Sequence, residues 1–451
     1  MFGKMKTAAV ALAATACAIA APTGASAAAK AQTAHNVKQF VCLPTYRVGE
    51  YARHRWWDGM EDMFSYVNRV RGGVNGVKLN VHEYESEWEV SRGIQIYEQC
   101  KHGLDGSPLA FFITLSTPLT YALEPRAVHD KIPLLDIGGG RPEAKDGLVF
   151  PYEFPLMLSY YSQGAVELGW IARELGGYDK LKGKNIVSVY NDSAYGRATQ
   201  PIMAAAAKKF GFQNIQIPVP NPGVEQAAIW RQVRADKPAF VVLHTWGVQT
   251  PVAIKTAVAY GIPVKKMLGE QWAGATGADV IPAGKAADGF CALTAFPEGT
   301  HFALLQQLKK EIVDKGLSFL PNKAQLGAGY YNVGVIYAIL VTEAMRAGMS
   351  KFGDHVLNAH EMEWGLQHMN VNDARLKQIG ASGLMQPIHT TPANHEGGGA
   401  ARIQCWNGHQ FYLVTDWIKG DTNLAHEVLV EMADVYAKAH GITPKALNGA
   451  N

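Results

Sequence analysis

Residues 185–196 read NIVSVYNDSAYG: a β-rich run leads into a polar turn, and an amphipathic segment follows from 196. This alternation of strand and helix occurs on both sides of the stretch. Before it, the pattern predicts strands at 39–44, 78–84, 109–115 and 132–137 and helices at 52–70, 90–102 and 119–130. From 185 onward it predicts strands at 185–190, 215–219, 239–245 and 266–269 and helices at 196–210, 224–235 and 249–260. Residues 185–196 therefore begin a second unit that resembles the first.

Two successive runs of strand, helix and strand predict an α/β fold with two doubly wound parallel sheets. Each sheet should carry a ligand crevice at the carboxyl ends of its strands. Residues 152–159 are the expected first crossing between the units. We expect residues 28–155 and 297–384 to form lobe 1, and residues 156–296 and 385–451 to form lobe 2. After 297 the pattern is mostly helical, at 302–315, 325–346, 359–367 and 423–440, with a hairpin near 410–415.

The amino terminus has the features of an export signal. Lys4 and Lys6 precede an uncharged, Ala-rich run of about 15 residues, which is too short to span a bilayer. The small residues at 25–27 fit the signal-peptidase requirement and predict cleavage after Ala27, so that residues 1–27 are a signal peptide. Two alternatives remain open, a disordered Ala-rich tail and a lipoprotein attached through Cys17.

The composition narrows the class of protein further. The 451 residues are 48% apolar and 18% charged with a net charge of +3, which is typical of a globular protein and excludes a disordered chain. A single basic patch at 53–55 argues against nucleic-acid binding. No later stretch has 18 uninterrupted apolar residues, as a membrane span would, and the motifs of phosphate loops, zinc proteases and serine hydrolases are absent. The sequence therefore predicts a binding protein rather than an enzyme, with no cofactor or metal.

Export would leave four cysteines in an oxidising compartment, Cys42, Cys100, Cys291 and Cys405. Four cysteines allow three pairings. We favour Cys42 with Cys100 and Cys291 with Cys405, because each bridge then lies within one lobe. Four buried free thiols are the alternative.

Several short segments, in order, resemble a known family. They are Leu43-Pro44, Tyr51, the glycines at 72, 73 and 76, the run 190–196, and the pattern from His389 through Pro392 to His395. This set is similar to the type I periplasmic binding proteins, and within them to the leucine/isoleucine/valine-binding branch of ABC-importer receptors. The resemblance implies two lobes joined by three crossings that close around a small-molecule ligand. It also implies a monomer in the periplasm that delivers the ligand to a membrane ABC permease.

The resemblance also implies which residues hold the ligand. From lobe 1 these are Ser116 and Thr117 after the third strand, the backbone of Gly138 and Gly140 after the fourth, and Tyr51 after the first. From lobe 2 they are Tyr195, Trp246 and an acid after the next strand, where Gln271 stands in an ungapped alignment and Glu270 in an alignment shifted by one residue.

Two departures bear on the ligand. If Gln271 faces the cleft, a ligand ammonium lacks its charge partner, and Gly140 stands where a hydroxyl is expected. Aromatic residues lie near the cleft loops, among them Trp56, Trp57 and Trp272. Such residues favour ligands with a planar or aliphatic part or with a positive charge. We therefore expect a small carboxylate, an amide or an aromatic compound more readily than leucine. A ligand-sensing subunit of a signalling system and an exported hydrolase are the alternative functions.

Overall fold

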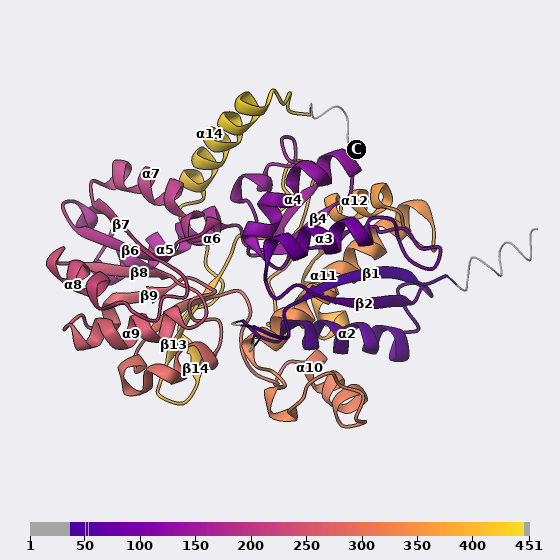
Figure 1. Ribbon diagram of the computed structural model, residues 1–451, viewed down its shortest axis with the longest axis horizontal. Helices are drawn as coiled ribbons and strands as arrows, with labels where there is room; N and C mark the ends of the chain where they lie inside the picture. The colour runs from indigo at the N-terminus through magenta and orange to yellow at the C-terminus, as the bar shows by residue number, and fades with distance from the viewer. Residues whose placement is uncertain (1–36, 50, 53, 446–451) are drawn as a thin grey trace, which may run out of the picture.

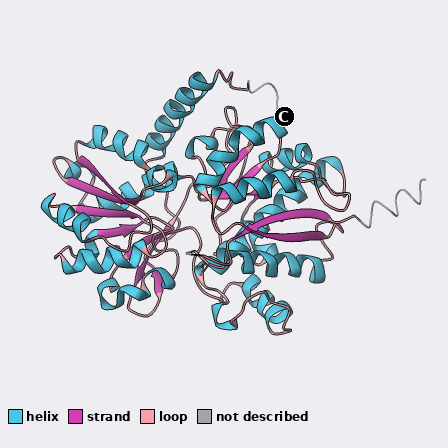
Figure 2. Ribbon diagram, viewed as in Figure 1, coloured by secondary structure: helices cyan, strands magenta, loops and turns pink. Residues whose placement is uncertain are grey.

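The computed structural model describes residues 37–49, 51–52 and 54–445, and the predicted signal peptide lies outside these residues. Strands form the centre of each of two lobes, and helices cover them (Figure 1, Figure 2). We call the part built on strands β1 to β5 lobe 1 and the part built on strands β6 to β10, β13 and β14 lobe 2.

Lobe 1 contains two short parallel groups of strands. β1 (Gln39–Thr45) pairs with β2 (Leu79–Glu85), and β3 (Phe112–Ile113), β4 (Leu134–Ile137) and β5 (Glu153–Leu156) pair in that order. β1, β3, β4 and β5 are buried along their whole length, as expected for strands covered by helices on both faces. The helices that follow the first strands are α2 (Trp56–Val70), α3 (Val90–Cys100) and α4 (Thr117–Asp130).

Lobe 2 contains one seven-stranded sheet in the order β14-β13-β10-β9-β8-β6-β7. Its parallel part consists of β6 (Asn185–Asn191), β7 (Gln213–Val219), β8 (Phe240–His244), β9 (Met267–Gly269) and β10 (Cys291–Thr294). β13 (Arg402–Trp406) and β14 (Phe411–Leu413) run antiparallel at one edge, as the predicted carboxyl-terminal hairpin. The helices are α5 (Tyr160–Leu175), α6 (Ala194–Arg197), α7 (Gln200–Phe210), α8 (Ala227–Ala235) and α9 (Gln249–Ala259).

The chain passes between the lobes three times. It leaves β5 of lobe 1 for α5, leaves β10 of lobe 2 for α10 (Ala303–Leu308), and returns from β12 (Ile388–His389) to β13. The first and third crossings are bonded together, because the amide of Met157 donates to the carbonyl of Glu396 at 2.8 Å and Gly399 donates to the carbonyl of Met157 at 2.7 Å. The predicted fold, two α/β lobes joined by three crossings, is confirmed.

The rest of lobe 1 is mainly helical. α11 (Gly329–Phe352) packs against α2 and against α12 (Ala359–Gln367), and α13 (Asp373–Ile379) lies between β11 (Asn370–Val371) and β12. α11 is long and apolar enough to cross a membrane, but 83% of its most apolar window is buried inside the protein, which makes it a core helix. The short helical turns are Pro142–Lys145 (η1), Tyr178–Leu181, Val264–Lys266, Gly277–Asp279, Ile281–Ala287, Lys309–Val313 and Lys323–Gln325.

Several elements differ from the sequence-based expectation. The predicted helix at 196–210 is two helices, because Pro201 lies at the start of α7 and cannot continue α6. β3 is only two residues long, although 109–113 are all buried. β5, β10 and β13 are four or five residues long and mostly buried, so they lack the alternation of polar and apolar residues that would have revealed them.

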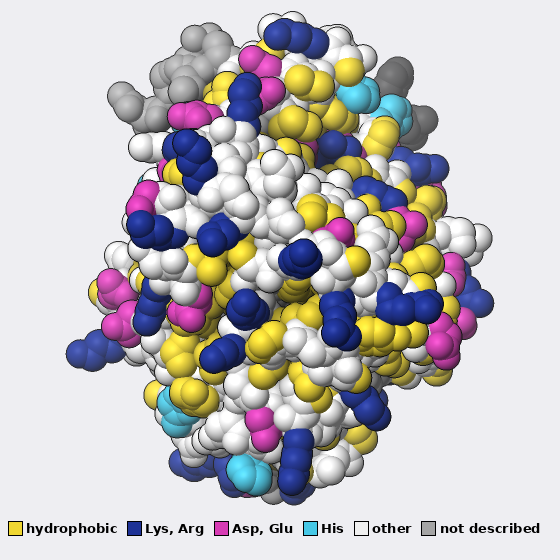
Figure 3. Space-filling view, turned by 90° about the vertical axis from the view of Figure 1, so that its left-hand side faces the viewer, with side chains coloured by type: hydrophobic (Ala, Val, Ile, Leu, Met, Phe, Trp, Pro, Cys, Tyr) yellow, Lys and Arg dark blue, Asp and Glu magenta, His cyan; other side chains and the backbone are white. Residues whose placement is uncertain are grey.

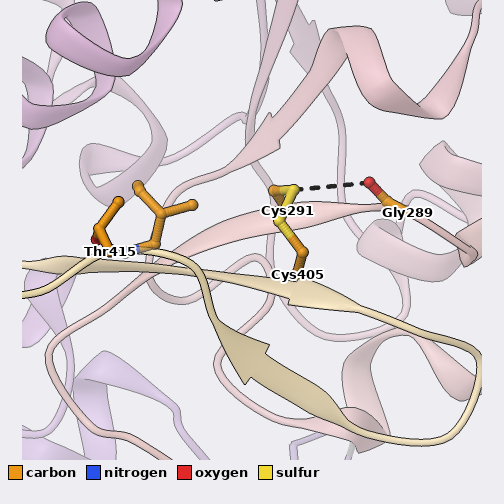
Figure 4. The surroundings of a disulfide bond; sticks show 5 residues. Gly289, Cys291, Cys405 and Thr415 are labelled. Carbon is orange, nitrogen blue, oxygen red and sulfur yellow. Dashed lines mark hydrogen bonds between the residues drawn. A yellow bond between two sulfur atoms is a disulfide. The ribbon is translucent and has the colours of Figure 1, made fainter.

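Both disulfides link cysteines within a lobe. Cys42 of β1 pairs with Cys100 at the end of α3, with their Cα atoms 6.2 Å apart. Cys291 of β10 pairs with Cys405 of β13, where the two residues are direct neighbours across the antiparallel ladder (Figure 4). The pairing is the chain-local one, and neither bridge joins the two lobes.

The carboxyl-terminal helix α14 (Thr422–His440) contacts both lobes (Figure 1). Its first part packs on α5 and α7, and Asp421 beside it forms an ion pair of 2.7 Å with Lys209. Its last part packs on η1, and Tyr436 donates a hydrogen bond to Glu124 of α4. α14 therefore extends across the boundary between the lobes.

Basic side chains gather on the outside of lobe 2. Figure 3 shows Lys and Arg distributed over the end of the molecule formed by this lobe, with fewer Asp and Glu among them. The exposed basic residues on the helices and turns there include Lys208, Lys209, Arg231, Arg234, Lys255, Lys265 and Lys266. These charges lie at the surface, and none of these residues lines the cavity described next.

Candidate ligand-binding site

The predicted site residues follow the carboxyl ends of strands in both lobes. Ser116 and Thr117 follow β3, Gly138 follows β4, Tyr195 follows β6 and Trp246 follows β8. Because the carboxyl ends of parallel strands meet at one edge of a sheet, each lobe presents its set of loops at that edge. The structure brings the two sets together around one small cavity.

The cavity has a volume of about 40 Å³ and is lined from both lobes. The lining residues are Trp56, Trp88, Leu115, Ser116, Thr117, Asp136, Gly139, Tyr160, Tyr195, Trp246 and Trp272. Ser116, Thr117, Tyr195 and Trp246 are therefore where the sequence-based site placed them, at the cavity. Tyr51, Gly138, Gly140, Glu270 and Gln271 are not among its lining residues, and each takes a different position around it.

Close helix packing places Trp56 at the cavity. Trp56 is the first residue of α2, and a side chain on Gly334 of α11 would overlap its carbonyl oxygen. A side chain on Gly59 of α2 would in turn overlap the carbonyl oxygen of Tyr331. These two glycines let the helices approach closely. The loop before α2 is anchored by Arg47, which forms an ion pair of 2.6 Å with Asp58.

The start of α4 forms one wall of the cavity. Leu115 has a left-handed backbone (φ 51°) and turns the chain from β3 into the helix, of which Ser116 is the N-cap residue. The hydroxyl of Ser116 is buried and has no hydrogen-bond partner among the described residues. The hydroxyl of Thr117 lies 3.0 Å from that of Tyr160. Ser116 therefore has hydrogen-bonding capacity left for a ligand at this wall.

Gly138 is one of the points at which the lobes touch. Its carbonyl oxygen accepts hydrogen bonds from Gln163 (2.9 Å), from Gln271 (2.8 Å) and from the indole of Trp272 (3.0 Å). Its φ is 62°, and a side chain on it would overlap the Gln271 amide. Only glycine both adopts this φ without strain and leaves room for the Gln271 amide. Gln271 thus bridges the lobes, while Gly140 lies against Glu153 inside lobe 1.

Glu270 lies behind the cavity wall. One of its carboxyl oxygens accepts hydrogen bonds from the hydroxyl of Tyr195 (2.7 Å) and from the amide of Trp272 (2.9 Å). Burial raises the pKa of Glu270 to about 8, although the nearby charge of His244 lowers it. At neutral pH this side chain is therefore mostly uncharged, and it positions two wall residues. The ring of His244 lies 3.0 Å from the carboxylate of Glu167.

Aromatic rings form most of the remaining wall, and they stand at steep angles to one another. The rings of Trp56 and Trp272 are 5.5 Å apart at 79°, those of Trp246 and Trp272 are 6.2 Å apart at 84°, and those of Tyr195 and Trp246 are 6.4 Å apart at 68°. The indole N–H groups of Trp56 and Trp246 are buried without a partner among the described residues. The rings thus form a box with unused hydrogen-bond donors.

Tyr51 and His54 support this box from lobe 1. The ring of His54 stacks on Trp246 at 4.2 Å and 15°, and the ring of Tyr51 lies 5.7 Å from Trp246 and 4.5 Å from Trp88. Trp57 is fully buried, its ring 4.8 Å from that of Tyr46. Trp246 of lobe 2 is therefore held against lobe 1, whereas Trp57 belongs to the core.

Sequence reasoning missed five cavity residues: Trp88, Leu115, Asp136, Gly139 and Tyr160. Asp136 is the only one that carries a charge. One of its oxygens accepts a hydrogen bond from Tyr337 (2.9 Å), and the other lies 3.2 and 3.3 Å from the hydroxyls of Thr120 and Thr114. Burial raises the pKa of Asp136 to about 6, although these hydroxyls lower it.

Four of the described non-glycine residues with positive φ lie at the cavity, beside it or in the first crossing. Arg55, Trp88, Leu115 and Met157 have positive φ values of 48°, 62°, 51° and 71°. Trp88 and Leu115 line the cavity, Arg55 precedes Trp56, and Met157 lies in the first crossing. Such residues cost free energy and persist where the surrounding structure fixes them, which is common at functional sites. Among the described residues, no group of three or more metal-binding side chains occurs.

Two lobes, three crossings and a cavity lined from both lobes define a ligand clamp of the periplasmic-binding class. A comparison with protein families agrees with this geometry. The family model described as periplasmic binding protein matches residues 38–410. The chain belongs to the periplasmic binding protein family.

Solved structures are similar over most of the chain. A crystal structure described as an ABC transporter permease from the Pseudomonas fluorescens group is 48% identical, with a TM-score of 0.86, over 91% of this chain and 99% of that one. A branched-chain amino acid ABC transporter protein from Thermus thermophilus with bound valine is 21% identical, with a TM-score of 0.72, over 87% and 98% of the chains. A solute-binding protein from R. palustris in complex with benzoate is 17% identical, with a TM-score of 0.64, over 85% and 98%. No curated protein matches the chain.

Proposed function

We propose that this protein is the exported solute-binding receptor of an ABC importer. It closes around one small molecule and delivers it to a membrane permease. The observation that carries the proposal is the cavity itself, whose walls come from both lobes, with Ser116 and Thr117 on one side and Tyr195 and Trp246 on the other. A site divided in this way is complete only when the lobes are closed.

In this proposal the ligand is an amino acid, an amide, or a small aromatic or aliphatic carboxylate. The aromatic walls favour a small ligand with apolar surface. The unused hydrogen-bond donors of Ser116, Trp56 and Trp246 favour a ligand that also carries a hydrogen-bond acceptor. Among proteins of the same fold, one holds valine, one benzoate and one 4-hydroxybenzoate. Those ligands show that such cavities take both amino acids and aromatic acids.

The residue roles in this proposal follow the geometry. Ser116 and Thr117 bind the polar end of the ligand, and Tyr195 and Trp246 enclose its body. Gly138 and Gln271 latch the lobes, while Tyr51 supports Trp246 and Glu270 positions Tyr195. Gly140 shapes the loop after β4, where a larger residue would press on Glu153.

The biological setting is part of the same proposal. Residues 1–27 direct export to the periplasm, and the receptor works there as a monomer. Lobe 1 comprises residues 28–155 and 297–384, and lobe 2 comprises residues 156–296 and 385–451. The three crossings would act as the hinge between them.

A thermal-shift screen tests the function. The mature protein is heated with amino acids, amides, small carboxylates, amines and alcohols, and a ligand raises the melting temperature according to RT ln(1 + [L]/Kd). Small-angle scattering with and without the best compound then measures closure. A compound that raises the melting temperature, makes the protein more compact and is recovered unchanged supports a receptor. Turnover of that compound would contradict it.

A further inference from the structure

Asp136 differs from the other carboxyl groups near the cavity because it lines the cavity. Its carboxyl is almost completely buried, with 5% of the residue exposed, and its neighbours are the hydroxyls of Tyr337, Thr114 and Thr120. Hydroxyls stabilise a carboxylate but do not neutralise it. Among the described residues, no Lys, Arg or His forms an ion pair with Asp136. A buried carboxylate without a counter-charge is costly unless a cation reaches it.

The walls around Asp136 suit a cation. Six lining residues are aromatic, and the described lining contains no Lys or Arg. The rings of Trp56 and Trp246 stand at 79° and 84° to that of Trp272, so these rings do not stack on one another. An ammonium group inside such a box is attracted by the rings and by the carboxylate together.

Asp136 also disfavours a ligand whose only charge is negative. Thr120 donates toward Asp136 and lies 3.0 Å from the carbonyl oxygen of Ser116, so the carboxylate is one side chain away from the start of α4. An isolated carboxylate bound at Ser116 would meet a like charge in a place shielded from water. An ammonium group on the same ligand would remove that repulsion.

We propose that Asp136 is the counter-charge for an ammonium group, so that the ligand of this receptor is a small ammonium compound, either a free amine or quaternary ammonium or a zwitterion. The inference rests on the proposed function: it keeps the zwitterions of the ligand class proposed above, excludes simple carboxylates and adds amines and quaternary ammonium compounds. It assigns the charge partner to the end of β4 in lobe 1. Glu270 and Gln271 do not have this role, because Glu270 lies behind Tyr195 and Trp272, and Gln271 bonds to Gly138.

Matched ligands of equal shape and different charge test the inference. Calorimetric titration at pH 7.5 compares choline with 3,3-dimethylbutan-1-ol, in which carbon replaces the charged nitrogen. It also compares propylammonium with propionamide and propionate, and glycine betaine with 3,3-dimethylbutanoate, in which carbon replaces the charged nitrogen. In at least one set the ammonium compound should bind at least tenfold more tightly than its uncharged or anionic partner.

A pair of variants links the preference to the residue. Asp136→Asn should abolish the charge preference, with at least a tenfold loss of affinity for the ammonium compound. Asp62→Asn is the matched control, because Asp62 is also buried in lobe 1 and bonded to hydroxyls of Ser318 and Tyr331, but does not line the cavity. Circular dichroism and thermal melting verify that both variants fold.

The outcomes separate the inference from the proposed function. If neutral or anionic compounds bind and ammonium compounds do not, or if Asp136→Asn keeps the affinity for an ammonium ligand, the inference is wrong and the receptor function stands. If no compound of any charge binds in these titrations or in the broad thermal-shift screen, the proposed function fails, and the inference fails with it. The charge preference of the unmodified protein decides the question even if Asp136→Asn does not fold.

Discussion

The side-chain amide of Gln271 donates a hydrogen bond of 2.8 Å to the backbone carbonyl of Gly138, and this bond joins lobe 2 to lobe 1. The two residues are 133 positions apart in the chain. Gln163 and the indole of Trp272, both also of lobe 2, donate to the same oxygen, so the contact is a small latch of three bonds. A latch of this size, worth about 0.5–1.5 kcal/mol per bond, is weak enough to open and strong enough to favour closure.

Gly138→Ala should prevent the latch from closing. The new methyl group would overlap the Gln271 amide, and the residue would have to keep a φ of 62°. The strain of about 1–3 kcal/mol predicts a roughly tenfold to hundredfold loss of affinity for whichever compound the screen identifies. Calorimetry measures the affinity, and scattering measures compactness. Gly72→Ala, at another positive φ but with open space around it, is the control. Equal affinities in the two variants would contradict the latch.

Trp246→Ala should weaken ligand binding at least tenfold and leave the protein folded. Trp246 lines the cavity, stacks on His54 and contacts Tyr195, so its removal opens a wall of the box. Intrinsic fluorescence and calorimetry report the binding. Trp364→Ala is a matched control, because Trp364 stacks on His368 in lobe 1 and does not line the cavity. Unchanged affinity in Trp246→Ala would remove this residue from the site.

Asp136→Asn should make the ligand-free protein more stable above pH 6. The pKa of Asp136 is raised from 3.8 to about 6, so folding favours the protonated form. The contribution of Asp136 to the free energy of unfolding is therefore fully present below pH 3.8. It falls by about 3 kcal/mol as the pH rises through 6. The Asp136→Asn variant does not lose this stability, because asparagine has no carboxyl group to ionise. The titratable groups that interact with Asp136 are Tyr46, Glu153, Tyr160 and Tyr337.

Chemical denaturation of both proteins between pH 4 and pH 8 measures this effect. The difference between the two unfolding free energies isolates Asp136, because the other groups are common to both proteins. A difference that stays constant over this range would show that Asp136 keeps an ordinary pKa.

Removing the disulfide Cys42–Cys100 should destabilise the protein without altering the cavity. The bridge closes a loop with a sequence separation of 58, which in the chain-entropy treatment stabilises by about 4 kcal/mol. The double variant Cys42→Ser, Cys100→Ser should therefore unfold at lower denaturant and bind ligand with unchanged affinity when folded. A loss of affinity in the folded variant would show that β1 and α3 help to hold the site.

The sequence predicts the fold well where strands and helices are long. β6 and β8 are confirmed because parallel strands covered on both sides appear as largely apolar runs. The site could be predicted only in part. Ser116, Tyr195 and Trp246 lie directly after strands, and their register follows from the family resemblance.

The other cavity residues lack such a signal. Asp136 is inside the strand β4, where a single acid in an apolar run gives no indication of its direction. Trp88 follows an acidic stretch that is typical of a solvated surface, and Tyr160 is in a helix that follows a crossing. These residues line one cavity only because the two lobes pack at a particular angle. That angle is a property of tertiary packing and not of the local sequence pattern.

The helix α14 limits how the two lobes can move. Its 19 residues form a spacer of about 28 Å whose length is fixed by its own backbone hydrogen bonds. One end is attached to α5 and α7, and the other to η1 and Glu124. A separation of the lobes along the helix axis would break one of these attachments. The helix therefore ties the spacing between η1 of lobe 1 and α7 of lobe 2 to its own length.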